Sequence, residues 1–126
     1  MELIDQVLSL SQLSELYKLG FDIVDKSSMC WIKHPDNDKM GLTIFNKELY
    51  DKKEIECIPT LSIGDIIDIL PNELNINTKY HNGIYTLLLN NKEVYYSNES
   101  NYYVFFTEDK LIDTLYETLI FIITYF

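Results

Sequence analysis

The chain ends in a strongly hydrophobic segment, residues 111–126, which must be buried if the chain is to fold in water. The segment is shorter than the roughly 20 apolar residues that cross a bilayer, and it carries Asp113 and Glu117. Its apolar residues recur at helical intervals, in a stripe of Leu111, Ile112, Leu115, Leu119, Ile122 and Ile123. We therefore predict a C-terminal core helix that is capped by Thr107.

Two further helices are predicted upstream. Ser9 and Gln12 have the spacing of a capping box, and the apolar residues that follow recur at helical intervals. Gly20 stands where a left-handed residue ends such a helix. In the middle of the chain, Thr60 or Ser62 can cap a short helix, which the proline at position 71 ends.

Strands are predicted between and after these helices. Residues 29–33 and 42–45 are rich in β-branched, aromatic and other apolar residues, whereas residues 51–56 are charged and indicate a surface connection. From residue 77 onward the pattern has period two, with turn signals at residues 81–83, 90–91 and 97–101. We expect a single α+β domain over residues 1–126: an antiparallel sheet of about four to five strands packed against the N-terminal and C-terminal helices.

Doubled tyrosines are the first candidate binding feature. Alternation along a strand places Tyr102, Val104 and Phe106 on one face of the sheet, and Tyr103 and Phe105 on the other. Only a second layer or a partner can cover the face that the helices leave free. The tyrosines predicted to bind a protein partner are Tyr95, Tyr96, Tyr102 and Tyr103.

Charge supplies the second candidate feature. The formal net charge is −10, and all ten basic residues are lysines, so direct binding to nucleic acid or to an anionic membrane is disfavoured. Asp109, Asp113 and Glu117 recur every four residues on the predicted last helix. This stripe is either a solvated helix face or a binding surface for a basic protein partner.

No arrangement of residues supports catalysis, a metal or a cofactor. The segment that begins at Asp36 resembles a calcium loop but has Met40 and Lys47 where ligands are required. Cys30 and His34 are about 13 Å apart in an extended strand, too far for a nucleophile and its base. Together with Cys57, Cys30 is expected to be a reduced core thiol, and His81 a turn residue. The first residues lack the basic start of a signal peptide, so we expect a cytoplasmic protein.

The layout of the chain also resembles a known group. An opening helix that closes on residues 19–22, a lone Trp31, the segment 58–60 before a short helix, and the closing helix resemble small uncharacterised phage and prophage proteins of Bacteroidetes. The absence of Ala and Arg agrees with an AT-rich genome. In size, acidity and this implied origin, the chain resembles anti-CRISPR proteins.

These observations lead to three functional hypotheses. The first is a non-enzymatic phage-type protein that binds and inhibits a basic host protein, such as a nucleic-acid-handling defence nuclease of the CRISPR type. The second is a structural or housekeeping module of a mobile element that associates with itself, for example as a homodimer. The third is an enzyme with an unrecognised site, for which no motif with a mechanism is present.

Overall fold

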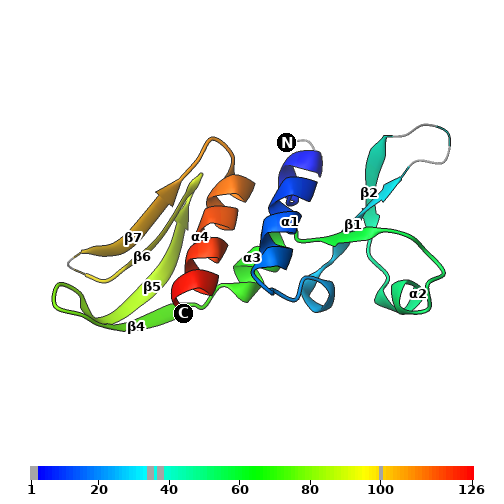
Figure 1. Cartoon of the computed structure of the whole chain (residues 1–126). Helices are drawn as coiled ribbons and strands as arrows, with labels where there is room; N and C mark the ends of the chain where they lie inside the picture. The colour runs from blue at the N-terminus through cyan, green and yellow to red at the C-terminus, as the bar shows by residue number, and fades with distance from the viewer. Residues whose placement is uncertain (1–2, 34–35, 37–38, 100) are drawn as a thin grey trace. The chain divides into compact units, whose positions relative to one another are not determined.

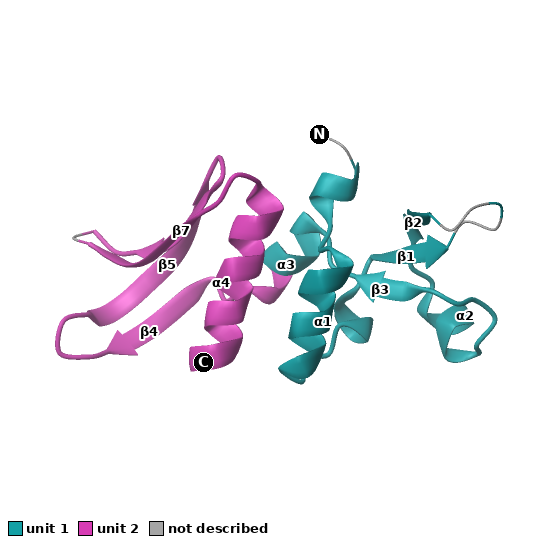
Figure 2. Cartoon of the chain, turned by 45° about the horizontal axis from the view of Figure 1, so that its top comes forward, with its two compact units in different colours: residues 1–67 teal, residues 68–126 magenta. Residues whose placement is uncertain are grey.

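A computed structural model describes residues 3–33, 36, 39–99 and 101–126 of the chain. It divides the chain into two compact units, residues 1–67 and residues 68–126 (Figure 2). The first unit contains a three-stranded antiparallel sheet and the second a four-stranded one. The α+β class and the helices near both ends of the chain are confirmed, but the strands belong to two sheets rather than one. A single domain stays a prediction.

The first unit opens with the 3-10 turn η1 (Leu3–Gln6) and the helix α1 (Leu10–Lys18). The capping box is present: the backbone N–H of Gln12 donates to Ser9 Oγ at 3.2 Å, and the backbone N–H of Ser9 donates to Gln12 Oε1 at 2.9 Å. Gly20 follows the helix with a φ of 77°, a conformation that L side chains rarely adopt. The predicted start and end of this helix are confirmed.

The sheet of the first unit has the order β2-β1-β3. Its strands are β1 (Met29–Lys33), β2 (Met40–Ile44) and β3 (Ile58–Thr60). The strand β1 is confirmed residue for residue, whereas β2 begins two residues before the predicted range. Neither β3 nor the short helix α2 (Lys47–Asp51) was predicted. The 3-10 turn η2 (Val24–Lys26), which lies between α1 and β1, was not predicted either. Such short elements carry too little periodicity to be recognised.

The core of the first unit forms around the main chain of Leu8. The carbonyl oxygen of Leu8 accepts hydrogen bonds from Trp31 Nε1 at 3.0 Å and from Thr60 Oγ1 at 2.9 Å. Its backbone N–H donates to the carbonyl of Leu61 at 3.0 Å. All four side chains are buried. These bonds join the segment before α1 to β1 and β3.

The helix α3 (Ile63–Ile69) contains the division between the two units. Of the two predicted caps, Ser62 is the one used: its Oγ accepts from the backbone N–H of Asp65 at 3.1 Å. In return, Asp65 Oδ2 accepts from the backbone N–H of Ser62 at 2.9 Å. Pro71 follows the helix, and the middle helix is thereby confirmed.

The second unit is an antiparallel meander with the order β4-β5-β6-β7 (Figure 1). Its strands are β4 (Glu73–Asn77), β5 (Asn82–Asn90), β6 (Glu93–Ser97) and β7 (Tyr102–Thr107). The three predicted turns separate them, but β4 lies before the predicted start of the period-two pattern. The helix α4 (Leu111–Tyr125) covers one face of this sheet and contacts β6 and β7.

The start of α4 differs from the prediction. Thr107 is the last residue of β7, and the helix begins after Lys110, whose side chain makes no cap hydrogen bond. Within the helix, Thr114 supplies the missing polar contact, because its Oγ1 accepts from the backbone N–H of Glu108 at 2.9 Å. The same hydroxyl donates to the carbonyl of Lys92 at 2.8 Å. The prediction of Thr107 as the cap is wrong because Thr107 pairs with Glu93 in the sheet, three residues before the N-cap position of the helix.

The core of the second unit lies between its sheet and α4. The buried cluster consists of Leu74, Ile76, Tyr85 and Tyr96, and partly buried residues packed against it are Leu87, Tyr103, Val104 and Ile122. On α4 the buried apolar residues are Ile112, Leu115 and Leu119, three of the six in the predicted stripe. The other three, Leu111, Ile122 and Ile123, are only partly buried. We call the side of the sheet that faces this cluster the covered face, and the other side the open face.

Candidate protein-binding surface

A β-bulge decides which face each tyrosine of β7 occupies. Tyr96 lies opposite Val104, whereas Ser97 lies opposite Tyr102, so β7 has one extra residue at this point. Tyr103 and Val104 consequently both pack on the covered face. The predicted grouping of Tyr102 with Val104, and of Tyr103 with Phe105, is wrong, because strict alternation does not hold across a bulge.

Three aromatic rings meet on the open face, and we call them the ring cluster: Tyr95, Tyr102 and Phe105. Tyr95 contacts Tyr102 edge to face with centroids 5.1 Å apart, and it stacks on Phe105 at 5.7 Å. The centroids of Tyr102 and Phe105 are 5.8 Å apart. These distances are those of favourable aromatic pairs. The cluster is therefore a set of rings that hold one another in place.

The ring cluster remains accessible to a partner. Tyr102 is 56% exposed and Phe105 44% exposed, although each already packs against two other rings. On the neighbouring strand β5, Ile84 and Leu88 are also exposed, and Leu88 lies directly opposite Tyr95. Adjoining exposed apolar residues of this kind mark interaction surfaces.

The strands of the meander carry charge of one sign, whereas its lysines, Lys79 and Lys92, lie in the turns. Its four strands contain two acidic residues, Glu73 and Glu93, and no lysine. Both acids alternate with buried residues along their strands, which places them on the open face with Tyr95. The open face therefore combines aromatic rings with negative charge, a combination that attracts Lys and Arg side chains.

Two of the four tyrosines predicted to bind a partner do not lie on the open face. Tyr96 is fully buried, its hydroxyl donates to the carbonyl of Pro71 at 2.7 Å, and burial raises its pKa to about 12. Tyr103 packs on the covered face against Tyr85 and against Phe121 of α4. These two tyrosines stabilise the fold, and Tyr95 and Tyr102 are the members of each pair that a partner can reach.

The three residues of the predicted acidic stripe do not all lie on α4. Asp109 precedes α4, which begins at Leu111, so only Asp113 and Glu117 share the helix. Asp113 is partly buried and Glu117 is exposed. Because α4 covers the face opposite the ring cluster, these acids do not form one surface with Tyr95 and Tyr102.

Sequence reasoning missed the apolar members of the open face, Phe105, Leu88 and Ile84. Phe105 stands in the same strand as the doubled tyrosines, but its contact with Tyr95 depends on the cross-strand register. Leu88 joins the surface for the same reason, as the direct partner of Tyr95 on β5. Hairpin turns of known length, between β6 and β7 for Phe105 and between β5 and β6 for Leu88, are the signals that could have revealed these pairs.

The cysteines, the histidines and the calcium-like loop are the other candidates for chemistry. Cys30 and Cys57 are free thiols, the first buried and the second half-buried, and burial raises the pKa of Cys30 to about 12, with smaller contributions from the neighbouring Cys57. The ring of His81 packs edge to face against Tyr103. His34, and positions 37 and 38 of the calcium-like loop, lie outside the described residues. Within the described ranges, no three His, Cys, Asp or Glu side chains are grouped to hold a metal ion.

Comparisons with known proteins do not indicate the function of the open face. No family model, no curated protein and no solved structure matches this chain. Among the residues that the structure describes, none of the helices has the length and apolar character needed to cross a bilayer. The arrangement of the open face is therefore the strongest indication of function.

Proposed function

We propose that this chain is a non-enzymatic interaction protein that binds a basic protein through the open face of its second unit. The observation that carries the proposal is the ring cluster, in which Tyr102 and Phe105 of β7 stay about half exposed, in a sheet whose other strands carry two acids and no lysine. Aromatic side chains that are held in place lose little entropy on binding and dominate interface energies.

The chemistry of the face selects for a basic partner. A Lys or Arg side chain that lies over one of the exposed rings gains cation–π energy, and Glu93, two residues from Tyr95 on β6, can pair with it. The net charge of −10 adds long-range attraction that accelerates association and weakens as salt is added. Repulsion by the same charge opposes binding to nucleic acid itself.

The finer proposal concerns the class of target. Clefts that hold nucleic acid are lined with Lys and Arg, and an acidic, aromatic surface competes there with phosphate and with bases. We infer inhibition of a host nuclease of the defence type, in agreement with the resemblance to phage and anti-CRISPR proteins. In this view the open face occupies the cleft and excludes the nucleic acid.

The test is affinity capture from a bacterial lysate at low salt, with matched variants. The double variant Tyr102→Ser and Phe105→Ser removes the accessible rings, whereas Tyr80→Ser removes a more exposed tyrosine, 77% exposed, outside the cluster. We expect a basic protein to be captured by the wild type and by Tyr80→Ser but not by the double variant. Purified partner should then release its nucleic acid when the wild type is added.

Two results would overturn the proposal. The first is capture of the same proteins by the wild type and the double variant, which would show that the ring cluster binds nothing. The second is a solution mass of a dimer that becomes a monomer in the double variant, measured by sedimentation. That outcome would assign the open face to self-association.

A further inference from the structure

The first unit contains an apolar cavity of about 520 Å³ between α1, the segment after it, β3 and α2. Its walls are mostly apolar side chains, including Leu13, Phe21, Val24, Ile58 and Pro59. All of its lining residues belong to residues 1–67. The cavity is therefore separate from the open face, which lies in the second unit.

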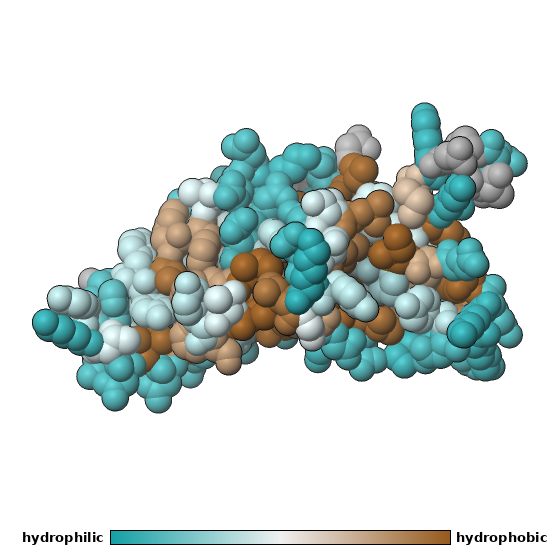
Figure 3. Space-filling model, viewed as in Figure 1, coloured by the Kyte–Doolittle hydropathy of each residue, from teal (hydrophilic) through white to brown (hydrophobic). Residues whose placement is uncertain are grey.

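The size and walls of the cavity fit a small organic molecule. Pockets that bind such ligands enclose roughly 300 to 1,000 Å³ and have mainly apolar and aromatic walls. Leu10, Tyr17 and Ile58 line the cavity and are 42%, 78% and 44% exposed. Figure 3 shows hydrophobic residues that reach the surface between hydrophilic ones over this unit. Apolar surface left open in this way is stabilised when a ligand covers it.

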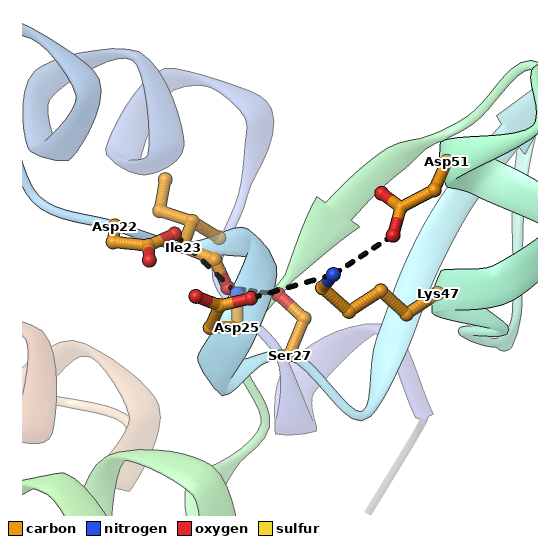
Figure 4. Close-up of polar contacts among 6 residues, drawn as sticks. All are labelled: Asp22, Ile23, Asp25, Ser27, Lys47 and Asp51. Atoms are coloured by element: carbon orange, nitrogen blue, oxygen red, sulfur yellow. Dashed lines mark hydrogen bonds and ion pairs between the residues drawn. The ribbon is translucent and has the colours of Figure 1, made fainter.

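The charge at the cavity has one sign. Asp22 is the charged member of the described lining, and its Oδ1 accepts a long hydrogen bond of 3.4 Å from the backbone N–H of Asp25. Nearby, Lys47 of α2 is held between Asp25 and Asp51, with Nζ–O distances of 3.7 and 2.8 Å (Figure 4). Two carboxylates thus engage the Lys47 ammonium group, and the charge within the described lining of the cavity is the negative charge of Asp22.

We infer that the cavity binds a small amphiphilic cation, with an apolar body and an ammonium-type head. The apolar walls take the body of the ligand. The head lies near the Asp22 carboxylate and against the faces of Tyr17 and Tyr50, which both line the cavity. An anionic amphiphile with the same apolar body meets the same walls but is repelled by Asp22.

The experiment uses two probes of equal chain length below their micelle concentrations, octyltrimethylammonium and octyl sulfate. Binding is followed by NMR chemical-shift titration and by protection of Cys57, a half-buried lining residue, against alkylation. We expect the cation to bind at least about tenfold more tightly than the anion, and to slow Cys57 alkylation. Asp22→Asn should remove most of that preference.

Two matched variants on α1 distinguish loss of binding caused by a filled cavity from loss caused by misfolding. Ser14 lines the cavity and Ser11 does not, and both are exposed on the same helix. Ser14→Trp should fill the cavity and abolish binding of octyltrimethylammonium, whereas Ser11→Trp should leave it unchanged. Equal affinity for both probes, or binding that survives Ser14→Trp in a folded variant, would overturn the inference. Tyr102→Ser with Phe105→Ser should bind the cation normally, so this inference and the proposed function can fail separately.

Discussion

The ring of Tyr95 stacks on the ring of Phe105 across the β6–β7 pair, with centroids 5.7 Å apart and planes inclined by 18°. The two residues are direct partners in the strand register. Tyr102 completes the cluster only because the bulge in β7, between Tyr102 and Val104, turns it to the same side. One irregularity of the backbone thus assembles three rings on a face that α4 does not cover.

Stability should distinguish the two faces of this sheet. Tyr102→Ala removes ring contacts at a half-exposed position and should lower the free energy of unfolding by about 0.5 to 1.5 kcal/mol. Tyr96→Ala empties a fully buried position and should cost about 3 to 5 kcal/mol. Urea unfolding measures both values. Equal costs for the two variants would contradict the assignment of Tyr102 to the open face.

The Thr114 hydroxyl should stabilise the start of α4. Thr114→Val keeps the shape of the side chain but leaves the backbone N–H of Glu108 and the carbonyl of Lys92 without this partner. We expect a loss of about 1 to 3 kcal/mol in thermal or urea unfolding. Thr118→Val is the matched control, because Thr118 Oγ1 donates to a carbonyl within its own helix, that of Thr114, at 2.8 Å. A control that costs as much as Thr114→Val would refute this role.

Asp65 should be the most important polar residue of α3. Besides capping the helix with Ser62, its Oδ2 accepts from the backbone N–H of Ser28 at 3.0 Å and from Ser28 Oγ at 2.7 Å. Asp65→Ala should therefore lower the free energy of unfolding by about 1 to 3 kcal/mol. Asp68→Ala, at an exposed position of the same helix, should change it by less than about 0.5 kcal/mol.

Alkaline pH should destabilise the protein through two buried groups. Burial raises the pKa of Cys30 from 9.0 to about 12 and that of Tyr96 from 10.0 to about 12. The folded chain keeps both protons at a pH where the unfolded chain releases them, so this contribution is intact below about pH 9 and is lost as the pH rises towards 12.

Two variants test this pH dependence. Cys30→Val and Tyr96→Phe each remove one titrating group, and each should flatten the fall in unfolding free energy above pH 9 or pH 10, respectively. The difference between each variant and the wild type at pH 7 serves as the reference. If that difference stays constant up to pH 11, the two groups do not contribute to alkaline unfolding.

Local signals in the sequence were sufficient for much of the fold. The capping box at Ser9, the left-handed Gly20, the strand at residues 29–33 and the apolar stripe of α4 each depend on residues a few positions apart. Hydrogen bonds and side-chain periodicity within one segment determine such features. For the candidate site, the same reasoning selected Tyr95 and Tyr102 but could not separate them from the neighbouring buried tyrosines.

The rest was decided by contacts between distant residues. The short strand β3 exists because Pro59 pairs with Cys30, and the cavity of the first unit joins side chains from Leu10 to Pro59. The ring cluster needs the register of β6 against β7 and a bulge, neither of which has a side-chain pattern of its own. By itself the sequence determined the acidity and the local elements. The tertiary structure alone decided which aromatic rings remain open to a partner, because burial depends on the residues that the fold brings opposite each ring.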